Sequence, residues 1–306
     1  MTKIESFTLS SARDGLPLSV CAALPEGEIR ALVQLAHGMA EHKERYLPFM
    51  EYLAENGYAS VINDHRGHGG SVRTKDDLGY FYQDGPNALV DDLHQLTLYF
   101  KGRHPGKKLF LFGHSMGSLA VRAYRQRYDG DIDGLVVCGS PGQNPATGAG
   151  LVLNRLMTLL KGERYRSPMF TAMTTGGYSK AYPNEGSANA WLSANPENVR
   201  RYDADPLCGF PFTLNGYRAL LELLRDAYRP VSAGNPELPV HFISGAGDPC
   251  APDRKGFEHA VQRMKADGYR KVTSKLYEGM RHEILNETDR QTVYRDLLAL
   301  FEGWMK

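Results

Sequence analysis

The chain alternates short apolar runs with segments whose apolar residues recur at helical spacing, and this alternation constrains the fold more than any other feature. Strands that alternate with helices pair mostly in parallel, and the helices cover both faces of the sheet. The sequence therefore predicts an α/β fold with a mostly parallel central sheet. Six strand-like runs occupy the first 140 residues: 3–10, 16–24, 31–37, 59–64, 109–113 and 134–140.

The alternation stops after the sixth run. The next stretch carries Gly- and Pro-punctuated segments and two apolar helical patterns, around residues 151–160 and 217–224, without a convincing strand. Strand-like runs at 239–245 and 272–279, each followed by a helical pattern, then resume the alternation. We therefore expect one α/β domain interrupted by an inserted helical cap: residues 1–140 and 236–306 form the domain, and residues 141–235 form the cap.

Composition excludes several classes of protein. With 42% hydrophobic and 23% charged residues, the chain has the make-up of an ordinary globular protein. A net charge of +1, without a basic tract, offers no basis for binding nucleic acid. We find neither a signal-peptide pattern nor an apolar run long enough to span a bilayer, so we expect a cytoplasmic protein. We expect its four cysteines to be free thiols, because they are far apart in the sequence and no two of them have the spacing of a metal site. They are Cys21, Cys138, Cys208 and Cys250.

Three chemically reactive residues follow strand-like runs. Ser115, Asp248 and His282 each come directly after, or a few residues after, one of these runs. The carboxyl ends of parallel strands meet at one edge of a sheet, so we expect the three side chains to gather there. A serine hydroxyl becomes a nucleophile when an imidazole takes its proton and a carboxylate orients that imidazole. The arrangement therefore predicts acyl transfer.

The serine lies in the pentapeptide Gly113-His114-Ser115-Met116-Gly117. A Gly-x-Ser-x-Gly pattern arises by chance in about one chain of this composition in six, so it is weak alone. Its context strengthens it, because a strand-like run precedes it and a helical pattern (118–128) follows. Glycines on either side allow the strand and the helix to approach closely. The alternative is that Ser115 is only a small residue in a tight turn.

The order Ser…Asp…His around such a turn resembles the nucleophile elbow and triad of α/β-hydrolases. Five blocks, LAHGMAEHKERY, NDHRGHGGS, GHSMGS, SGAGDPC and YEGMRHEILNE, are similar to those of the monoacylglycerol lipase and lysophospholipase group, which is of the serine aminopeptidase S33 type. The segment DADPLCGFPFT resembles the cap of that group. These blocks extend from residue 35 to residue 287. The resemblance implies an α/β-hydrolase fold and a serine hydrolase of carboxylic esters.

The resemblance assigns roles to these residues. Ser115 is the expected nucleophile, and His282 is the expected base, because it alone among the ten histidines lies in a loop after the last strand-like run. Asp248 is the preferred acid, with Asp253 as the alternative five residues further on. Asp64 precedes the nucleophile and is better explained as a structural loop residue.

An oxyanion hole requires two backbone N–H groups that face the developing negative charge. We expect one from Met116, the residue after the nucleophile. The resemblance implies the second from Met39, which follows His37-Gly38 in the counterpart of the family's HG-containing loop. The alternative for this loop is a simple turn at the end of a strand.

No metal or organic cofactor is expected. His65 and His68 offer imidazoles, but no carboxylate or Cys spacing supports a metal site there. Cys250 lies two residues past the expected acid, where a thiol either reports on the site through oxidation or is a half-buried residue without consequence.

The cap carries one apolar stripe and one apolar cluster. Either they contact an acyl chain, with transient contact to a membrane surface, or they pack the cap on the main domain. The stripe comprises Leu153, Leu156, Met157 and Leu160, and the cluster comprises Leu220, Leu221, Leu223 and Leu224.

Several functions remain open for a protein of this fold. One alternative is an aminopeptidase, a thioesterase or an amidase. An aminopeptidase needs acidic cap residues to hold a free amino terminus, and Glu163 and Glu185 are the candidates. A non-catalytic binding protein of hydrolase fold is a further alternative, although such a role would not require serine, aspartate and histidine all at strand ends.

Overall fold

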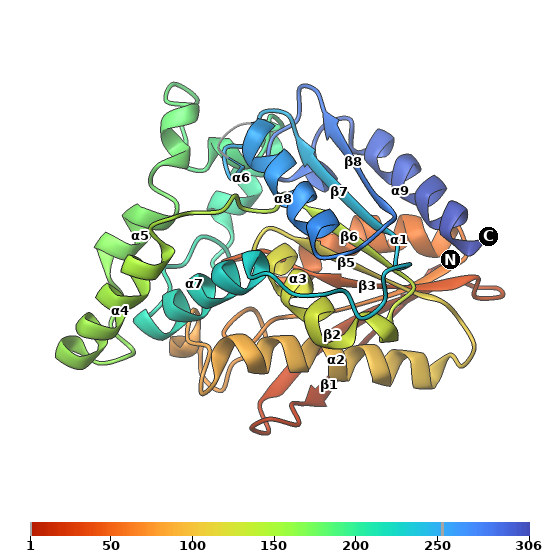
Figure 1. The fold of residues 1–306 in the computed structure, drawn as a ribbon, viewed down its shortest axis with the longest axis horizontal. Coiled ribbons are helices and arrows are strands. Elements are labelled where there is room, and N and C mark those ends of the chain that lie inside the picture. The colour runs from red at the N-terminus through yellow and green to blue at the C-terminus, as the bar shows by residue number, and fades with distance from the viewer. Residues whose placement is uncertain (1, 252–253) are drawn as a thin grey trace.

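The computed structural model describes residues 2–251 and 254–306, and its centre is an eight-stranded sheet (Figure 1). The strand order is β1-β2-β4-β3-β5-β6-β7-β8. Strand β2 pairs antiparallel with both β1 and β4, and every other pairing is parallel. The predicted mostly parallel sheet is confirmed. The strands are β1 (Lys3–Ser10), β2 (Pro17–Leu24), β3 (Ala31–Ala36), β4 (Tyr58–Asn63), β5 (Leu109–His114), β6 (Gly134–Cys138), β7 (Val240–Gly245) and β8 (Val272–Tyr277).

Helices cover both faces of the sheet. Strands β3 to β6 are apolar at nearly every position and buried at every residue, as expected for parallel strands covered on both sides. Residues of α1 and α9 pack with one face, and residues of α2, α3 and α8 pack with the other. These helices are α1 (Leu47–Glu55), α2 (Gly85–Arg103), α3 (Met116–Tyr128), α8 (Arg254–Ala266) and α9 (Arg290–Met305).

Between β6 and β7 the chain, which is described throughout this stretch, forms four α-helices and no strand. The sequence predicted two of them. The two missed helices are short, and each begins with a side-chain cap followed by proline, so their signal is local rather than periodic. In Figure 1, α4, α5 and α7 extend to the left of the sheet. The four are α4 (Thr147–Lys161), α5 (Pro168–Thr174), α6 (Pro196–Ala204) and α7 (Leu214–Tyr228).

The stripe on α4 serves two surfaces. Leu153 and Met157 pack against the main core, whereas Leu156 and Leu160 are exposed.

The division of the chain into a domain and a cap stays a prediction. Among the described helices, none is both long and apolar enough to cross a lipid bilayer.

Candidate active site

Ser115 occupies a strained turn between β5 and α3. Its backbone dihedrals are φ 54° and ψ −119°, a conformation that side-chain-bearing residues rarely adopt and that is often stored at functional sites. A Cβ at Gly117 would lie 2.2 Å from the carbonyl oxygen of Ala36, and one at Gly113 would lie 2.4 Å from that of Gly117. The two glycines are therefore required because the start of α3 approaches both β3 and β5 too closely for a side chain.

Asp248 and His282 meet at the ends of β7 and β8. His282 Nδ1 lies 2.9 Å from Asp248 Oδ2, and both residues are buried. Asp248 also accepts hydrogen bonds from the hydroxyl of Ser244 (2.8 Å) and the backbone N–H of Cys250 (2.9 Å). This geometry fixes Asp248 as the carboxylate partner of His282. The alternative acid, Asp253, lies outside the described residues.

Asp248 and His282 shift each other's pKa. Burial disfavours the imidazolium of His282, but the charge and hydrogen bond of Asp248 outweigh burial and raise the pKa of His282. Burial likewise disfavours the carboxylate of Asp248, but the charge of His282 and the hydrogen bonds it accepts lower the pKa of Asp248. The arrangement thus stabilises the imidazolium that forms once His282 accepts a proton, as a general base with an orienting carboxylate requires.

Ser115 and His282 line the same cavity. The hydrogen bonds among the described residues do not include one between their side chains, and His282 Nε2 instead lies 3.9 Å from Cys250 Sγ. Catalytic hydrogen bonds are often long before substrate binds, so this geometry is compatible with a serine–histidine couple. Burial and the nearby Asp248 charge raise the pKa of the Cys250 thiol well above its usual value, so this cysteine is a protonated neighbour of the site.

The two expected oxyanion donors have free N–H groups. Among the described residues, no hydrogen bond uses the backbone N–H of Met39 or of Met116. Met116 is the first residue of α3, where backbone N–H groups have no partner within the helix. The loop that carries Met39 passes close to the elbow, since a Cβ at Gly38 would lie 3.1 Å from that of Ser115.

A network of buried charged side chains joins the loop that carries Met39 to the loop that carries His282. Glu41 accepts hydrogen bonds from the backbone N–H of Gly38 and from Arg45 Nη1 (2.7 Å). Arg45 also donates to both carboxylate oxygens of Glu283, at 2.7 and 2.6 Å. Burial disfavours the carboxylate of Glu41, but the charge of Arg45 and the hydrogen bond and charge of His114 together outweigh burial and hold the pKa of Glu41 well below its usual value. The ion pairs therefore fix the positions of both loops around Ser115.

His114, directly before Ser115, belongs to the same network. Its Nε2 lies 3.2 Å from the carbonyl oxygen of His282, and its Nδ1 lies 3.1 Å from the hydroxyl of Tyr46. The sequence analysis did not identify Glu41, His114 or Glu283 as part of the site. The signal was present in the blocks LAHGMAEHKERY, GHSMGS and YEGMRHEILNE, which place these residues close to the expected site residues.

Three buried histidines pack beside the loop that carries Met39. The rings of His37 and His65 lie 4.1 Å apart, and His68 Nε2 accepts a hydrogen bond from the backbone N–H of Ala40 (3.2 Å). Burial lowers the pKa of His65 to about 3 and that of His68 to about 4, so both are neutral. Asp64 is also structural: it accepts hydrogen bonds from the backbone N–H and Nζ of Lys43, both at 2.8 Å.

The cavity beside Ser115 has a volume of about 540 Å³, within the usual range for small-molecule sites. Helix α7 provides three leucines of the predicted apolar cluster to its wall, while Leu223 is buried in the core. Trp191 closes one side, with its ring 5.0 Å from that of His282. No Lys or Arg is among the described residues that line the cavity. Its apolar lining includes Met39, Leu119, Phe170, Met173, Phe210, Leu220, Leu221 and Leu224.

The two acidic cap residues considered for amino-terminus recognition are absent from the described lining of the cavity. Glu163 accepts a hydrogen bond from the hydroxyl of Tyr80 (2.5 Å). Glu185 forms an ion pair with Arg281 (2.6 Å). Both carboxylates are therefore occupied elsewhere, and the structure does not bring them to Ser115.

Comparison with known proteins places the chain among hydrolases. Residues 27–289 match the family model described as serine aminopeptidase, S33. A monoacylglycerol lipase of Mycolicibacterium smegmatis is 30% identical over 90% of this chain and 89% of its own length. The phospholipase YtpA of Bacillus subtilis is 26% identical over 90% of this chain and 96% of its own length. The crystal structure of a thermostable carboxyl esterase from Bacillus coagulans, 23% identical, superimposes with a TM-score of 0.90 over the full length of both chains.

Proposed function

We propose, since this chain belongs to the serine aminopeptidase S33 family, that it is a serine hydrolase of neutral carboxylic esters and that monoacylglycerols are its substrate class. The observation that carries this proposal is the composition of one cavity. Ser115 and His282 line it together with apolar side chains, and the described lining includes no cation. Similarity to a monoacylglycerol lipase over most of both chains supports the same reaction.

In the proposed mechanism, Ser115 Oγ attacks the ester carbonyl carbon while His282 Nε2 accepts its proton. The N–H groups of Met39 and Met116 donate hydrogen bonds to the oxyanion. When the carbon–oxygen bond to glycerol breaks, the imidazolium returns the proton to the leaving alkoxide. Water, deprotonated by His282, then attacks the acyl-enzyme, and His282 returns this proton to Ser115 Oγ as the bond to the acyl group breaks and the fatty acid leaves. Asp248 remains ionised throughout and stabilises the imidazolium.

The cavity lining favours a neutral ester over a lysophospholipid. A phosphate group is usually recognised by Arg, Lys or several backbone N–H groups. The described lining provides no Lys or Arg, whereas Gln143, Asn144 and Asn189 offer amide groups suited to the hydroxyls of glycerol. The apolar side chains of α7 suit the acyl chain.

The aminopeptidase alternative has weaker support. A free amino terminus needs a carboxylate that is not already neutralised. The two carboxylates in the described lining are Glu41 and Glu283, and both are ion-paired with Arg45. With Glu163 and Glu185 also paired elsewhere, no described acidic group in the cavity is available for a substrate ammonium.

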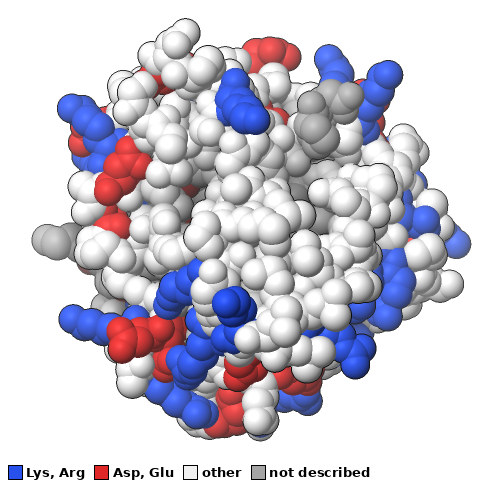
Figure 2. All heavy atoms as spheres, turned by 90° about the vertical axis from the view of Figure 1, so that its left-hand side faces the viewer, with Lys and Arg blue, Asp and Glu red and all other residues white. Residues whose placement is uncertain are grey.

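We also propose that the outer face of α4 and α5 contacts lipid aggregates. Figure 2 shows this side of the molecule as a broad uncharged area with charged residues of both signs at its margins. The basic residues Arg155 and Lys161 are exposed on α4, which suits an anionic surface. The large apolar side chains exposed on these two helices are Val152, Leu156, Leu159, Leu160, Met169 and Met173.

A substrate panel tests the proposed specificity. We expect 1-monooleoylglycerol and a neutral p-nitrophenyl ester to be hydrolysed, with kcat/KM at least about tenfold higher for monooleoylglycerol than for the lysophosphatidylcholine of the same chain. Alanine p-nitroanilide serves as the aminopeptidase substrate and should remain uncleaved. Preferred cleavage of the lysophospholipid or of the anilide would contradict the proposal.

A further inference from the structure

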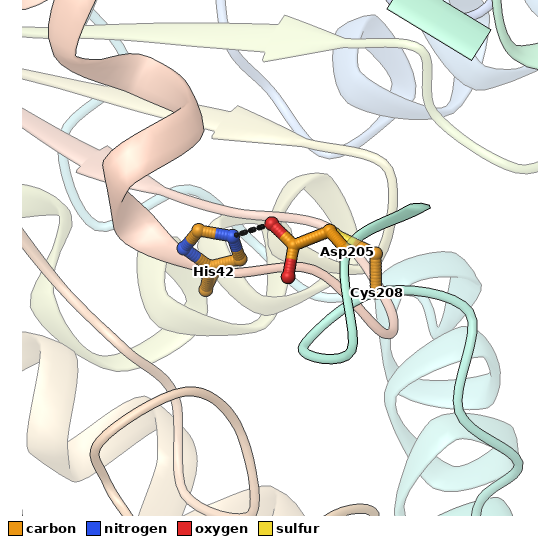
Figure 3. Close-up of side chains that lie close together, drawn as sticks. All are labelled: His42, Asp205 and Cys208. Atoms are coloured by element: carbon orange, nitrogen blue, oxygen red, sulfur yellow. Dashed lines mark hydrogen bonds and ion pairs between the residues drawn. The ribbon is translucent and has the colours of Figure 1, made fainter. Parts of the chain in front are cut away.

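A second cluster of reactive side chains lies between the expected cap and the loop that follows β3. His42 is three residues past Met39, whereas Asp205 and Cys208 belong to the segment between α6 and α7. His42 Nε2 lies 2.8 Å from Asp205 Oδ2, and Figure 3 shows the imidazole facing this carboxylate with Cys208 beside it. One nitrogen, one oxygen and one sulfur from these side chains all lie within 4.8 Å of one another.

This donor set suits zinc. Zn²⁺ is bound by imidazole nitrogen, thiolate sulfur and carboxylate oxygen, and calcium or magnesium would not select a thiol. The other ring nitrogen of His42 lies 2.7 Å from Glu44 Oε2. A carboxylate on the distal nitrogen is the usual support of a zinc-bound histidine, since it fixes the ring and increases its basicity. Glu44 therefore occupies the position that a metal site requires.

The geometry needs only a small adjustment. With ligand bonds of about 2.0 to 2.3 Å, tetrahedral zinc separates its donor atoms by about 3.3 to 3.7 Å. His42 and Asp205 would have to part by about 0.5 Å to admit the ion. The side chain of Asp205 is 31% exposed, so it can move and solvent can deliver the metal.

The neighbouring cations do not oppose a metal ion, because each is already neutralised. Lys43 forms ion pairs with Asp64 (2.8 Å) and Glu44 (2.6 Å). Arg45 pairs with Glu41 and Glu283.

We propose that His42, Asp205 and Cys208 form a three-ligand Zn²⁺ site whose fourth position is taken by water. Binding replaces the proton on His42 Nε2 and the proton on the Cys208 thiol with bonds to the metal, and both protons pass to solvent. The proposal goes beyond ester hydrolysis and does not depend on the role of Ser115.

The position of the site gives the metal a structural effect. Ala40, next to Met39, accepts hydrogen bonds from the backbone N–H of Gly209 (2.9 Å) and the hydroxyl of Tyr202 (3.0 Å). Zinc would therefore clamp the segment that holds Tyr202 and Gly209 to the oxyanion loop. A ligand that binds only the folded chain raises its melting temperature.

A competing site must be distinguished. Asp248, Cys250 and His282 also bring three donor atoms within 4.8 Å of one another. Here Asp248 is held by Ser244, Cys250 and His282, so the metal would have to disrupt the proposed catalytic pair. The experiment must therefore tell the two cysteines apart.

The test uses the full chain, stripped with a chelator and then titrated with Zn²⁺ against a chromogenic metal indicator. We expect one tight site in the wild type, and a charge-transfer absorption band from thiolate to metal when Co²⁺ is used instead. Zinc at a hundredfold excess over Kd should raise the melting temperature by about 5 °C. Cys208→Ser and Asp205→Asn should each weaken binding by at least about a hundredfold, and Glu44→Gln by about tenfold.

Cys250→Ser is the matched control and should keep both the zinc stoichiometry and the cobalt band. A melt and a circular dichroism spectrum of each metal-free variant verify that it is folded. The absence of binding by the wild type at micromolar zinc would overturn the proposal. So would a site that is lost in Cys250→Ser but retained in folded Cys208→Ser.

Discussion

The turn that carries Ser115 and the outer face of α4 and α5 use apolar and charged residues in opposite ways. Around Ser115 the backbone is packed so closely that a Cβ at Gly117 would lie 2.2 Å from a carbonyl oxygen, and the buried charges nearby form ion pairs. On α4, Leu159 and Leu160 are 77% and 81% exposed. Bond-making chemistry needs groups fixed within fractions of an ångström, whereas an adaptable apolar surface can meet a lipid aggregate.

The largest expected effect is a loss of kcat from a substitution near the closely packed turn that carries Ser115. Asp248→Asn should reduce kcat by about 10⁴-fold, because the amide stabilises neither the required tautomer nor the imidazolium of His282. Steady-state kinetics on a soluble p-nitrophenyl ester measures the loss. Asp267→Asn is the matched control, since Asp267 is also buried and paired with a cation, Arg125. It should lower stability without lowering kcat, and equal kcat losses would remove the special role of Asp248.

Alanine substitutions at two helical glycines sharpen the contrast in packing. Gly117→Ala should destabilise the fold by about 3 kcal/mol or more, because the methyl group collides with the backbone of β3. At Gly148, in the first turn of α4, a Cβ meets no atom within 4 Å. Gly148→Ala should therefore stabilise by up to about 1 kcal/mol. Urea denaturation measures both changes, and similar effects at the two sites would contradict the difference in packing.

Charged substitutions on the outer face of α4 test whether this face contacts lipid. The double variant Leu159→Glu, Leu160→Glu should lower hydrolysis of monooleoylglycerol in phosphatidylcholine vesicles by about tenfold, because two apolar contacts with lipid are lost. Hydrolysis of a soluble short-chain ester should be unchanged. Leu98→Glu is the control, since Leu98 is 52% exposed on α2. If Leu98→Glu impairs vesicle hydrolysis equally, the outer face of α4 and α5 has no special role.

The smallest expected effect is a shift in pH dependence. If neutral His282 is the active base, kcat/KM should fall on acidification with an apparent pKa above 6.5, because Asp248 raises the pKa of His282 above its usual value. In Asp248→Asn, burial remains but the stabilising carboxylate charge is lost, so the acid limb should move to lower pH. Rate profiles of both proteins test this sign. An unmoved limb would show that another group controls the profile.

The strands could be predicted because their signals are local, and the candidate site residues were selected by their place at strand ends. Buried parallel strands are continuous apolar runs, and the ends of three of them carry Ser115, Asp248 and His282. The resemblance to a family added Met39, which no periodicity could have identified.

Other features could not be predicted because they depend on pairings across the chain. Arg45 and Glu283 are 238 positions apart, and charged residues are usually exposed unless a partner is known. His42 and Asp205 are 163 positions apart and have no metal-site spacing in sequence. Helix α5 has seven residues, too few to show a helical period.

The most direct measurement is covalent labelling by a fluorophosphonate probe, with the modified residue identified by mass spectrometry. If Ser115 is the activated nucleophile, the wild type is labelled on Ser115. Ser115→Ala, with an unchanged melting temperature, then takes no label and loses ester hydrolysis by at least about 10⁴-fold. Undiminished labelling of folded Ser115→Ala, or a folded wild type that is neither labelled nor active on esters, would contradict the proposed function.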